Sequence, residues 1–488
     1  MRLPFDNSYT RLPERFYAPA QPARFPAPKL IRLNRDLAAE LGLDPAELEG
    51  SAGLAILSGQ EIALGSKPVA LAYAGHQFGN FVPQLGDGRA ILLGELMGRD
   101  GQRHDIQLKG AGRTPFSRGG DGRAAIGPVL REYLLSEAMA ALGIPTTRAL
   151  AAVATGEPVM RETALPGAVL TRVASSHIRV GTFQFFGARG DTEALRLLSD
   201  HVIARHYPSA AQAERPYRAL LDAVIAAQAD LVARWLLVGF IHGVMNTDNV
   251  SIAGETIDYG PCAFMDVYDP ATVFSSIDRM GRYAFGNQPS IAHWNLARLA
   301  EALLPLLAGD QDAAIEEAQE ALAAFGPIFE RAYHGGLRRK IGLVGERVDD
   351  VDLVSEILGA MTANEVDFTL FFRRLGDAVT GADEPVRSLF VDATAFDGWA
   401  VRWRGRLDED GRAPAARRSA MNAVNPAFIP RNHRVEAMIA AAIERGDYSL
   451  FEEMLTLVAR PYDDQPAFAR YAIPPEEQER VAATFCGT

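Results

Sequence analysis

The strongest constraint on the fold is a place where a long apolar pattern stops and two polar loops follow. Residues 219–240 form a nearly continuous apolar stretch of helical length, and His242-Gly-Val-Met-Asn-Thr-Asp-Asn249 comes directly after it. Asp258-Tyr-Gly260 begins nine residues after Asn249. Residues 250–257 read as two short β runs around an Ala-Gly-Glu turn, so we expect a hairpin that brings Asn249 and Asp258 to neighbouring strand ends. Both side chains offer the oxygen ligands that Mg²⁺ takes between a protein and phosphate groups.

This order of residues is the layout of a kinase-like metal site, with one departure. When the stretch is aligned on His242 and Asn249, the position of the usual catalytic aspartate holds Val244. Asp248, next to Asn249, could accept a proton from a hydroxyl, although it does not stand at that position; the alternative is a simple turn residue. We interpret His242 as a structural residue of the loop.

Upstream, the sequence predicts a three-stranded antiparallel meander over residues 81–85, 90–97 and 104–109, joined by Gly86-Asp-Gly-Arg89 and a second turn at 98–101. The third strand ends at Lys109, a glycine-rich loop follows, and a helix that begins near Pro128 carries Glu132. A strand lysine held by a helix glutamate is how kinases place an ammonium group on ATP phosphates. The alternative is an exposed lysine and an unrelated surface glutamate.

Two glycine-rich turns and two arginines are further candidates for binding an anion. Gly86 and Gly88 stand where a loop that covers phosphates belongs, and Asp121-Gly122 lies in a second such loop, whose amides could approach an anion closely. Either loop could equally be a plain surface turn. Arg172 and Arg179 flank the exit from the strand-rich region, where they suit either phosphate oxygens or ordinary surface ion pairs.

The remaining patterns give the outline of a two-lobed α+β protein. We expect an N-terminal extension (1–60) with helical spacing at 30–43, packed along the outside of the next domain. A strand-rich lobe (61–175) would include strands at 148–153 and 168–173 around a turn at 155–158. A lobe with the metal site (176–290) would be helical over 192–239 and irregular after 260. A helical C-terminal region (291–488) would hold helices near 292–307, 312–325, 351–361 and 367–375.

Composition limits the function classes. A net charge of −12 and a pI of about 5.4 argue against general binding to nucleic acid or anionic membranes, although residues 99–131 form a local cationic run. No uncharged apolar run reaches membrane-spanning length, and the first residues show no apolar signal core. The two cysteines, Cys262 and Cys486, lack metal-type spacing and suit a reducing compartment. We therefore expect a soluble cytoplasmic protein.

Taken together, these motifs resemble those of the selenoprotein O (YdiU) family of kinase-fold proteins. The resemblance spans nearly the whole chain. It is carried by Tyr73-Ala-Gly-His-Gln-Phe-Gly79, Gly86-Asp-Gly-Arg89, the segment 107–118, His242 to Asn249, Asp258-Tyr-Gly-Pro261, and the Asn-Pro and Pro-Arg-Asn-His pairings in 425–433.

The resemblance implies a two-lobed kinase-like fold and a pseudokinase that transfers AMP from ATP to Ser, Thr or Tyr hydroxyls of other proteins. ATP would bind in a flipped orientation, with the γ-phosphate buried among Lys109, Arg172 and Arg179. Asp248 would accept the hydroxyl proton, and Asn249 and Asp258 would hold Mg²⁺. The other positions that would line the nucleotide are Gly86, Gly88, Arg89, Asp121 and Gly122.

Several alternatives stay open. Related family members use UTP with Mn²⁺, so uridylylation is one. A small-molecule kinase is another, against which Val244 counts, and an inactive ATP-binding scaffold is a third, against which Lys109, Glu132, Asn249 and Asp258 count. Eukaryotic members carry selenocysteine near the C-terminus, where this chain has Cys486. We hypothesise a reversible bridge from Cys486 to Cys262; two unrelated thiols are the alternative.

Overall fold

The computed structural model describes residues 2–485, and its centre is an antiparallel sheet. The strand order is β1-β3-β6-β7-β10-β9-β2, and the short β8 also pairs with β10. Two small two-stranded sheets, β4 with β5 and β11 with β12, lie apart from this sheet. The strands are β1 (Tyr17–Pro19), β2 (Lys29–Leu33), β3 (Val69–Leu71), β4 (Gly75–Gln77), β5 (Asn80–Val82), β6 (Ala90–Met97), β7 (Arg103–Lys109), β8 (Ala124–Ala125), β9 (Arg148–Met160), β10 (Ala164–Ala174), β11 (Phe240–Ile241) and β12 (Ala263–Phe264).

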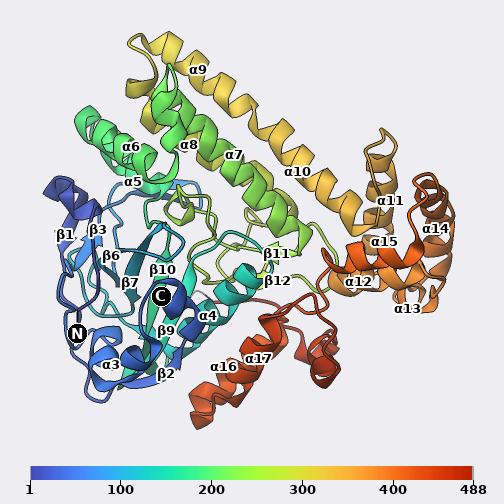
Figure 1. Ribbon diagram of the computed structural model, residues 1–488, viewed down its shortest axis with the longest axis horizontal. Helices are drawn as coiled ribbons and strands as arrows, with labels where there is room; N and C mark the ends of the chain where they lie inside the picture. Colours follow the sequence, from blue (N-terminus) through green and yellow to red (C-terminus); the bar gives the residue numbers. More distant parts are fainter. Residues whose placement is uncertain (1, 486–488) are drawn as a thin grey trace.

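Helices surround the sheet and make up most of the chain after it (Figure 1). Figure 1 shows the sheet at the left, the long helices α7 to α10 across the top, and α11 to α15 gathered at the right. The helices are α1 (Arg35–Glu40), α2 (Pro45–Glu49), α3 (Ser51–Leu57), α4 (Ile126–Ala141), α5 (Val180–Gly187), α6 (Thr192–His206), α7 (Pro216–Leu237), α8 (Gln288–Leu307), α9 (Gln311–Ala323), α10 (Phe325–Lys340), α11 (Asp350–Ala363), α12 (Phe368–Ala378), α13 (Glu384–Arg387), α14 (Ala393–Asp408), α15 (Pro414–Asn422), α16 (Asn432–Arg445) and α17 (Ser449–Val458). This order confirms the expected mixture of a strand-rich N-terminal part and a helical C-terminal region.

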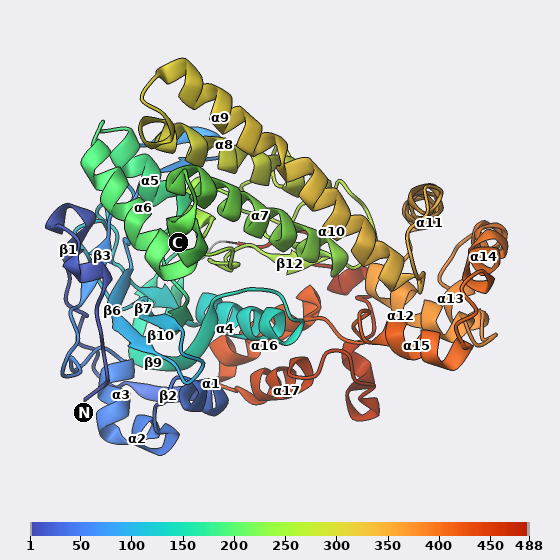
Figure 2. The ribbon, with the colours of Figure 1, turned by 45° about the horizontal axis from the view of Figure 1, so that its top comes forward.

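Three apolar cores hold these parts together. The largest runs from one face of the sheet through α5 to α8 and on to Trp399 and Trp403 in α14. A second core lies on the N-terminal helices and the other side of β6 and β7. A third fills the space between α4 and the pair α16 and α17, which lie side by side with α4 in Figure 2. Helix α4 is therefore buried between the sheet and the end of the chain.

The expected meander was only partly right. The β6–β7 hairpin is confirmed, but residues 81–85 do not form the first strand of the meander, because β5 pairs with β4 and β3 is the neighbour of β6. The chain between β5 and β6 instead lies along β3, where the Asp87 amide donates to the Leu71 carbonyl at 2.9 Å. The Gly86–Arg89 segment is thus a connection that crosses beside the sheet, not a tight turn between two of its strands.

The hairpin expected at 250–257 is wrong. Ser251 pairs with Arg179, and Thr256 pairs with Thr146, so the two short runs bind other segments and not each other. The Val180 amide donates to the Val250 carbonyl, and the Thr147 amide to that of Thr256, each at 3.0 Å. These pairings fix the chain between Asn249 and Asp258 to the segment just before α5 on one side and to the residues just before β9 on the other.

The first residues of the chain belong to the sheet, which corrects the expectation that they pack along its outside. Strands β1 and β2 form its two edges, and the first α-helix begins only at Arg35. The turn expected at 155–158 is wrong, because strand β9 continues to Met160 and the chain reverses at 161–163. Within β9, Gly156 takes a left-handed conformation (φ 77°) and packs against Ala27. The helical stretch 192–239 is confirmed apart from a break between α6 and α7.

Candidate nucleotide site

The candidate site is built around Asp258, which directly follows residues 250–257. Asp258 has a φ of 65°, a left-handed conformation that is strained for a residue with a side chain. Its Oδ1 accepts hydrogen bonds from Lys109 Nζ at 2.8 Å and from Arg172 Nη1 at 2.7 Å. Its Oδ2 accepts from Arg179 Nη1 at 2.9 Å. Burial would raise the pKa of Asp258, but the charges of these three cations outweigh it and hold the pKa well below its ordinary value.

The sheet and α4 position two of these cations. Lys109 ends β7, and its Nζ lies 2.5 Å from Glu132 Oε2 on α4, which is the lysine–glutamate contact predicted from the sequence. Arg172 on β10 is 1% exposed and lies 3.2 Å from Glu132 Oε1. The pairing of β10 with β7 sets Arg172 opposite Gln107, whose Oε1 accepts from Arg172 Nε and Nη2 at 3.1 and 2.6 Å.

The third cation, Arg179, begins α5 and is also buried. Besides Asp258, its Nη1 donates to the Asp248 carbonyl at 2.7 Å, and its guanidinium lies 4.6 Å from the Tyr73 ring centroid. Its Nη2 is 3.8 Å from Oδ1 of Asp87, a buried carboxylate whose Oδ2 also accepts from Gln107 Nε2 at 3.2 Å. Arg179 therefore joins the cation cluster to the loop that holds Asp248.

Asp87 and Gln107 also belong to this network, although neither was predicted from the sequence as a site residue. Gln107 had a readable signal, because it lies two residues before Lys109 on a strand and so shares its face. Asp87 lies within the Gly86–Arg89 segment, whose pattern predicts a turn and gives no sign that its carboxylate is buried. Burial raises the pKa of Asp87, which is consistent with a carboxylate at the margin of the cation cluster.

Asp248 lies in a short 3₁₀ turn (Thr247–Asn249) under the β4–β5 hairpin. The hairpin is tied to this loop by His76 N to Thr247 Oγ1 at 2.7 Å and by Gln77 Nε2 to Asp248 Oδ2 at 3.2 Å. Gly75 passes so close that a Cβ there would lie 2.4 Å from Asp248 Oδ1. That oxygen is buried and has no hydrogen-bond partner in the described part of the chain, and burial raises the pKa of Asp248 to about 6.

Asn249 and Asp258 remain together in the structure without the hairpin that was expected to join them. Asn249 Nδ2 donates to the Val244 carbonyl at 3.0 Å, which leaves its Oδ1 as an acceptor, and Asn249 lines the same cavity as the ionised Asp258. This donor pair fits a hard divalent cation that shares its remaining ligands with phosphates. Within residues 2–485 no group of three or more His, Cys, Asp or Glu side chains is placed to hold a metal ion. His242 is structural, because its Nε2 lies 2.9 Å from the Ile257 carbonyl oxygen.

These residues line one open cavity of about 480 Å³. The three cations and Asp258 line it together with Asp248, Asn249 and Val244. The two glycine-rich segments also contribute to the lining, so the structure brings the remaining predicted positions here: Gly86, Gly88, Arg89, Asp121 and Gly122.

The two glycine-rich segments need their glycines for packing. A Cβ on Gly86 (φ 73°) would lie 2.3 Å from the Phe116 ring, and one on Gly122 (φ 68°) would lie 2.1 Å from the Gly112 carbonyl oxygen. Asp121 pairs with Arg161 at 2.8 Å, an arginine of the cavity wall that the sequence analysis did not single out.

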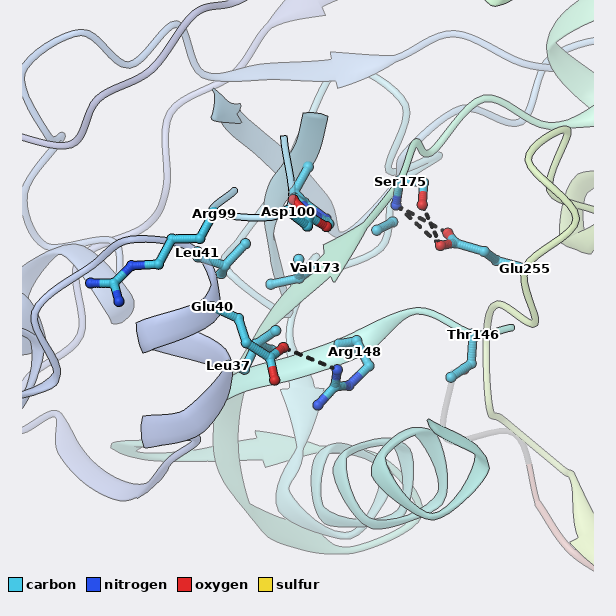
Figure 3. Close-up of a pocket in the computed structure, with 12 residues that line it drawn as sticks. Leu37, Glu40, Leu41, Arg99, Asp100, Thr146, Arg148, Val173, Ser175 and Glu255 are labelled. Atoms are coloured by element: carbon cyan, nitrogen blue, oxygen red, sulfur yellow. Dashed lines mark hydrogen bonds and ion pairs between the residues drawn. The ribbon is translucent and has the colours of Figure 1, made fainter. Parts of the chain in front are cut away.

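A second cavity, of about 270 Å³, lies between α1, the β6–β7 turn and the end of β10 (Figure 3). Figure 3 shows Glu255 reaching across to Ser175, whose amide and hydroxyl donate to the carboxylate at 3.1 and 2.5 Å. Burial raises the pKa of Glu255 to about 7. Ser175 precedes Arg179 by four residues, and Glu255 precedes Asp258 by three. This contact therefore holds together the two segments that carry Arg179 and Asp258.

Cys262, one of the two cysteines, is buried just beyond Asp258. Cys486 lies outside the described residues, so its bridge to Cys262 stays a hypothesis. Near the end of the described chain, Thr484 Oγ1 donates to the carbonyl of Pro261, and the Thr484 amide donates to that of Phe274 at 2.7 Å. The last described residues therefore lie against the segment that follows Asp258.

Comparison with known proteins identifies the family. A family model described as "Protein adenylyltransferase SelO" matches residues 1–459. The chain belongs to the SelO family. Proteins named "Protein nucleotidyltransferase YdiU" from Methylorubrum populi and Methylorubrum extorquens are 67% and 68% identical to it, each over 99% of both chains. One of the same name from Bradyrhizobium diazoefficiens is 64% identical over 100% of both.

Membership of the SelO family confirms the resemblance drawn from the motifs, and it makes the chain a nucleotidyltransferase. In the part of the chain that the structure describes, no helix combines the length and apolarity needed to cross a membrane.

Proposed function

We propose that this SelO-family protein has a two-lobed, kinase-like catalytic core and transfers AMP from ATP to Ser, Thr or Tyr hydroxyls of other proteins, with Mg²⁺ bound by Asn249 and Asp258. The observation that carries the proposal is the arrangement within one cavity. The three cations that bind Asp258 line it, two of them with buried side chains, and so does Asp248, whose Oδ1 has no hydrogen-bond partner within residues 2–485.

The positions of the charges favour cleavage at the α-phosphate. Lys109, Arg172 and Arg179 would bind the β- and γ-phosphates, which places the most negative part of ATP on the most buried cations. Val244 stands where a γ-transferring kinase has its aspartate, so the usual base for phosphate transfer is missing. The lysine–glutamate pair, the asparagine after the loop and the acidic residue after it support the kinase-like assignment.

The step we propose is an in-line displacement at the α-phosphorus. The acceptor hydroxyl oxygen forms a bond to that phosphorus as the bond to the β-phosphate bridging oxygen breaks. The hydroxyl proton passes to the carboxylate of Asp248, and pyrophosphate leaves against Lys109, Arg172 and Arg179. Mg²⁺, when bound, neutralises phosphate charge and polarises the phosphorus–oxygen bonds.

The experiment that tests this function compares label from α- and γ-labelled ATP on protein in a crude bacterial extract, with Mg²⁺ or Mn²⁺, beside α-labelled UTP. We expect label from α-labelled ATP and none from γ-labelled ATP. Label from the γ position alone would assign a phosphotransferase, and tight ATP binding without label would assign a scaffold. Stronger labelling from UTP would replace AMP by UMP.

Substitutions at Asp248 and Asp258 test the roles that we propose for these two residues. Asp248→Asn should lower transfer by about 10²- to 10⁴-fold with little change in ATP affinity, because it removes the proton acceptor but no phosphate contact. Asp258→Ala should abolish transfer, since it removes a metal ligand. The matched control, Asp312→Asn on the exposed first turn of α9, should behave as the parent. Transfer retained by Asp258→Ala would remove the metal assignment.

A further inference from the structure

The irregular chain after Asp258 carries exposed apolar side chains beside the cavity. We define residues 274–283 of this chain as the mouth loop. Ile277 in this loop is 57% exposed and lines the same cavity as Asp248 and Asn249. Three residues later, Met280 is 92% exposed. Apolar side chains held in water at the opening of a site are a common mark of a binding surface.

The backbone of the mouth loop is held firmly, so the exposure of these side chains is imposed by structure. The buried Asp278 carboxylate accepts from the amides of Arg282 at 2.9 Å and Tyr283 at 2.7 Å. At the start of the loop, the Ser276 amide donates to the Thr484 carbonyl at 3.0 Å. Asp278 therefore points inward and bonds its own loop, while Ile277 and Met280 on either side of it point away from the core.

The charge of the mouth loop indicates what it binds. Arg279, between Asp278 and Met280, is exposed, and among residues 2–485 its side chain makes no ion pair or hydrogen bond. Arg282 is partly exposed, its guanidinium lies 4.8 Å from the Trp294 ring centroid, and its side chain forms no ion pair within residues 2–485. In a protein of net charge −12, two arginines of one loop without acidic partners in the described chain form a local cationic surface.

We propose that the mouth loop is the docking surface for the acceptor protein, and that it selects a segment with an apolar side chain within three residues of the hydroxyl and carboxylates around it. The apolar side chain would pack on Ile277 and Met280, and the carboxylates would pair with Arg279 and Arg282. This inference rests on the proposed function for its acceptor, because the loop borders the cavity wall that holds Asp248.

The test measures peptide binding directly, so its outcome does not depend on transfer. Labelled twelve-residue peptides with one Ser are titrated by fluorescence anisotropy into the full chain with α,β-methylene-ATP and Mg²⁺. One peptide carries Leu near the Ser with flanking Glu, a second has Gln in place of Leu, and a third has Lys in place of Glu. We expect the first to bind at least about tenfold more tightly than the other two.

Variants locate that preference on the loop. Ile277→Asp combined with Met280→Asp should weaken the first peptide about tenfold or more while leaving nucleotide affinity unchanged, whereas the control Val348→Asp, equally exposed between α10 and α11, should not. Arg279→Glu should reverse the preference between the Glu and Lys peptides.

Three results would overturn the inference: equal affinity for all three peptides, no binding of any, or full binding by the double variant. A change in oligomeric state on mutation would instead assign the loop to contact between copies of the chain. The labelling experiment judges the proposed function separately, because peptide docking and the nature of the transferred group are measured in different assays.

Discussion

At the scale of single residues, Glu255 shows how a carboxylate away from the reaction supports the site. It accepts two hydrogen bonds from Ser175, and burial raises its pKa from 4.5 to about 7. The folded protein therefore binds a proton at Glu255 more tightly than the unfolded chain does. The stability from this proton is fully present below about pH 4.5 and is lost as the pH rises through about 7.

Replacing Glu255 by Gln should remove this pH dependence. The free energy of unfolding of the parent should fall relative to that of Glu255→Gln between pH 5 and pH 8, by about 1–2 kcal/mol after allowance for partial exposure of the side chain. Urea unfolding at both pH values measures the difference. Glu47→Gln, at an exposed position in α2, serves as the control and should keep the slope of the parent. Parallel slopes for Glu255→Gln and the parent would contradict the assignment.

At the scale of elements, α4 joins the cation cluster to the end of the chain through adjacent residues. Glu132 faces Lys109 and Arg172, while Arg131 turns the other way. Arg131 Nη1 lies 3.3 Å from both the Cys262 carbonyl and Asn432 Oδ1, and its Nη2 pairs with Glu436. One arginine thus links α4, the segment after Asp258 and α16, so the C-terminal helices fix the helix that orients Lys109.

Arg131→Ala should lower the free energy of unfolding by about 2–3 kcal/mol, because it removes the buried hydrogen bonds of this guanidinium and its ion pair with Glu436. Since α4 would lose its tether to α16, we also expect ATP affinity to fall about three- to tenfold, which isothermal titration calorimetry measures. The control Arg445→Ala, at the exposed end of α16, should change neither quantity. Lower stability with unchanged ATP affinity would restrict Arg131 to a structural role.

The sequence predicted elements better than their partners, for physical reasons. Strand alternation and helical spacing are local, so β6, β7, α4 and α7 were readable, and so was the contact of Lys109 with Glu132. The partners of residues 250–257 were not, because pairing across the fold leaves no local signal. Helix α10 was missed because it contains Gly326-Pro and Gly335-Gly336, which read as breaks. Gly336 is in fact needed there, since a Cβ would lie 2.2 Å from Leu237 on α7.

At the scale of the whole molecule, the first 33 residues supply both edge strands of the sheet. β1 pairs with β3 at one edge, and β2 pairs with β9 at the other. Exposed sheet edges present unpaired amides and carbonyls that promote association between chains. The segment expected to be a peripheral extension is therefore part of the frame that holds Lys109 and Arg172 in position.

Deletion of residues 2–33 should accordingly give a chain that aggregates or unfolds. It removes both edge strands and the buried Phe16 and Phe25 side chains, each of which contributes roughly 2–3 kcal/mol of apolar burial. Soluble yield, size-exclusion chromatography and thermal unfolding measure the outcome. A monomeric deletion variant with the melting temperature of the parent would show that the edges are dispensable.

The ion pairs of Asp258 have a thermodynamic consequence for ligand binding. In the structure its carboxylate occupies the three cations that a polyphosphate would need, so the protein holds an internal competitor for its own ligand. Phosphates that take over these cations would leave a buried negative charge, unless a divalent ion arrives to neutralise it. Metal and nucleotide should then each raise the affinity for the other by the same factor, as linkage requires. Without a metal ion, a polyanion should bind more weakly, because the same carboxylate competes with it for the three cations.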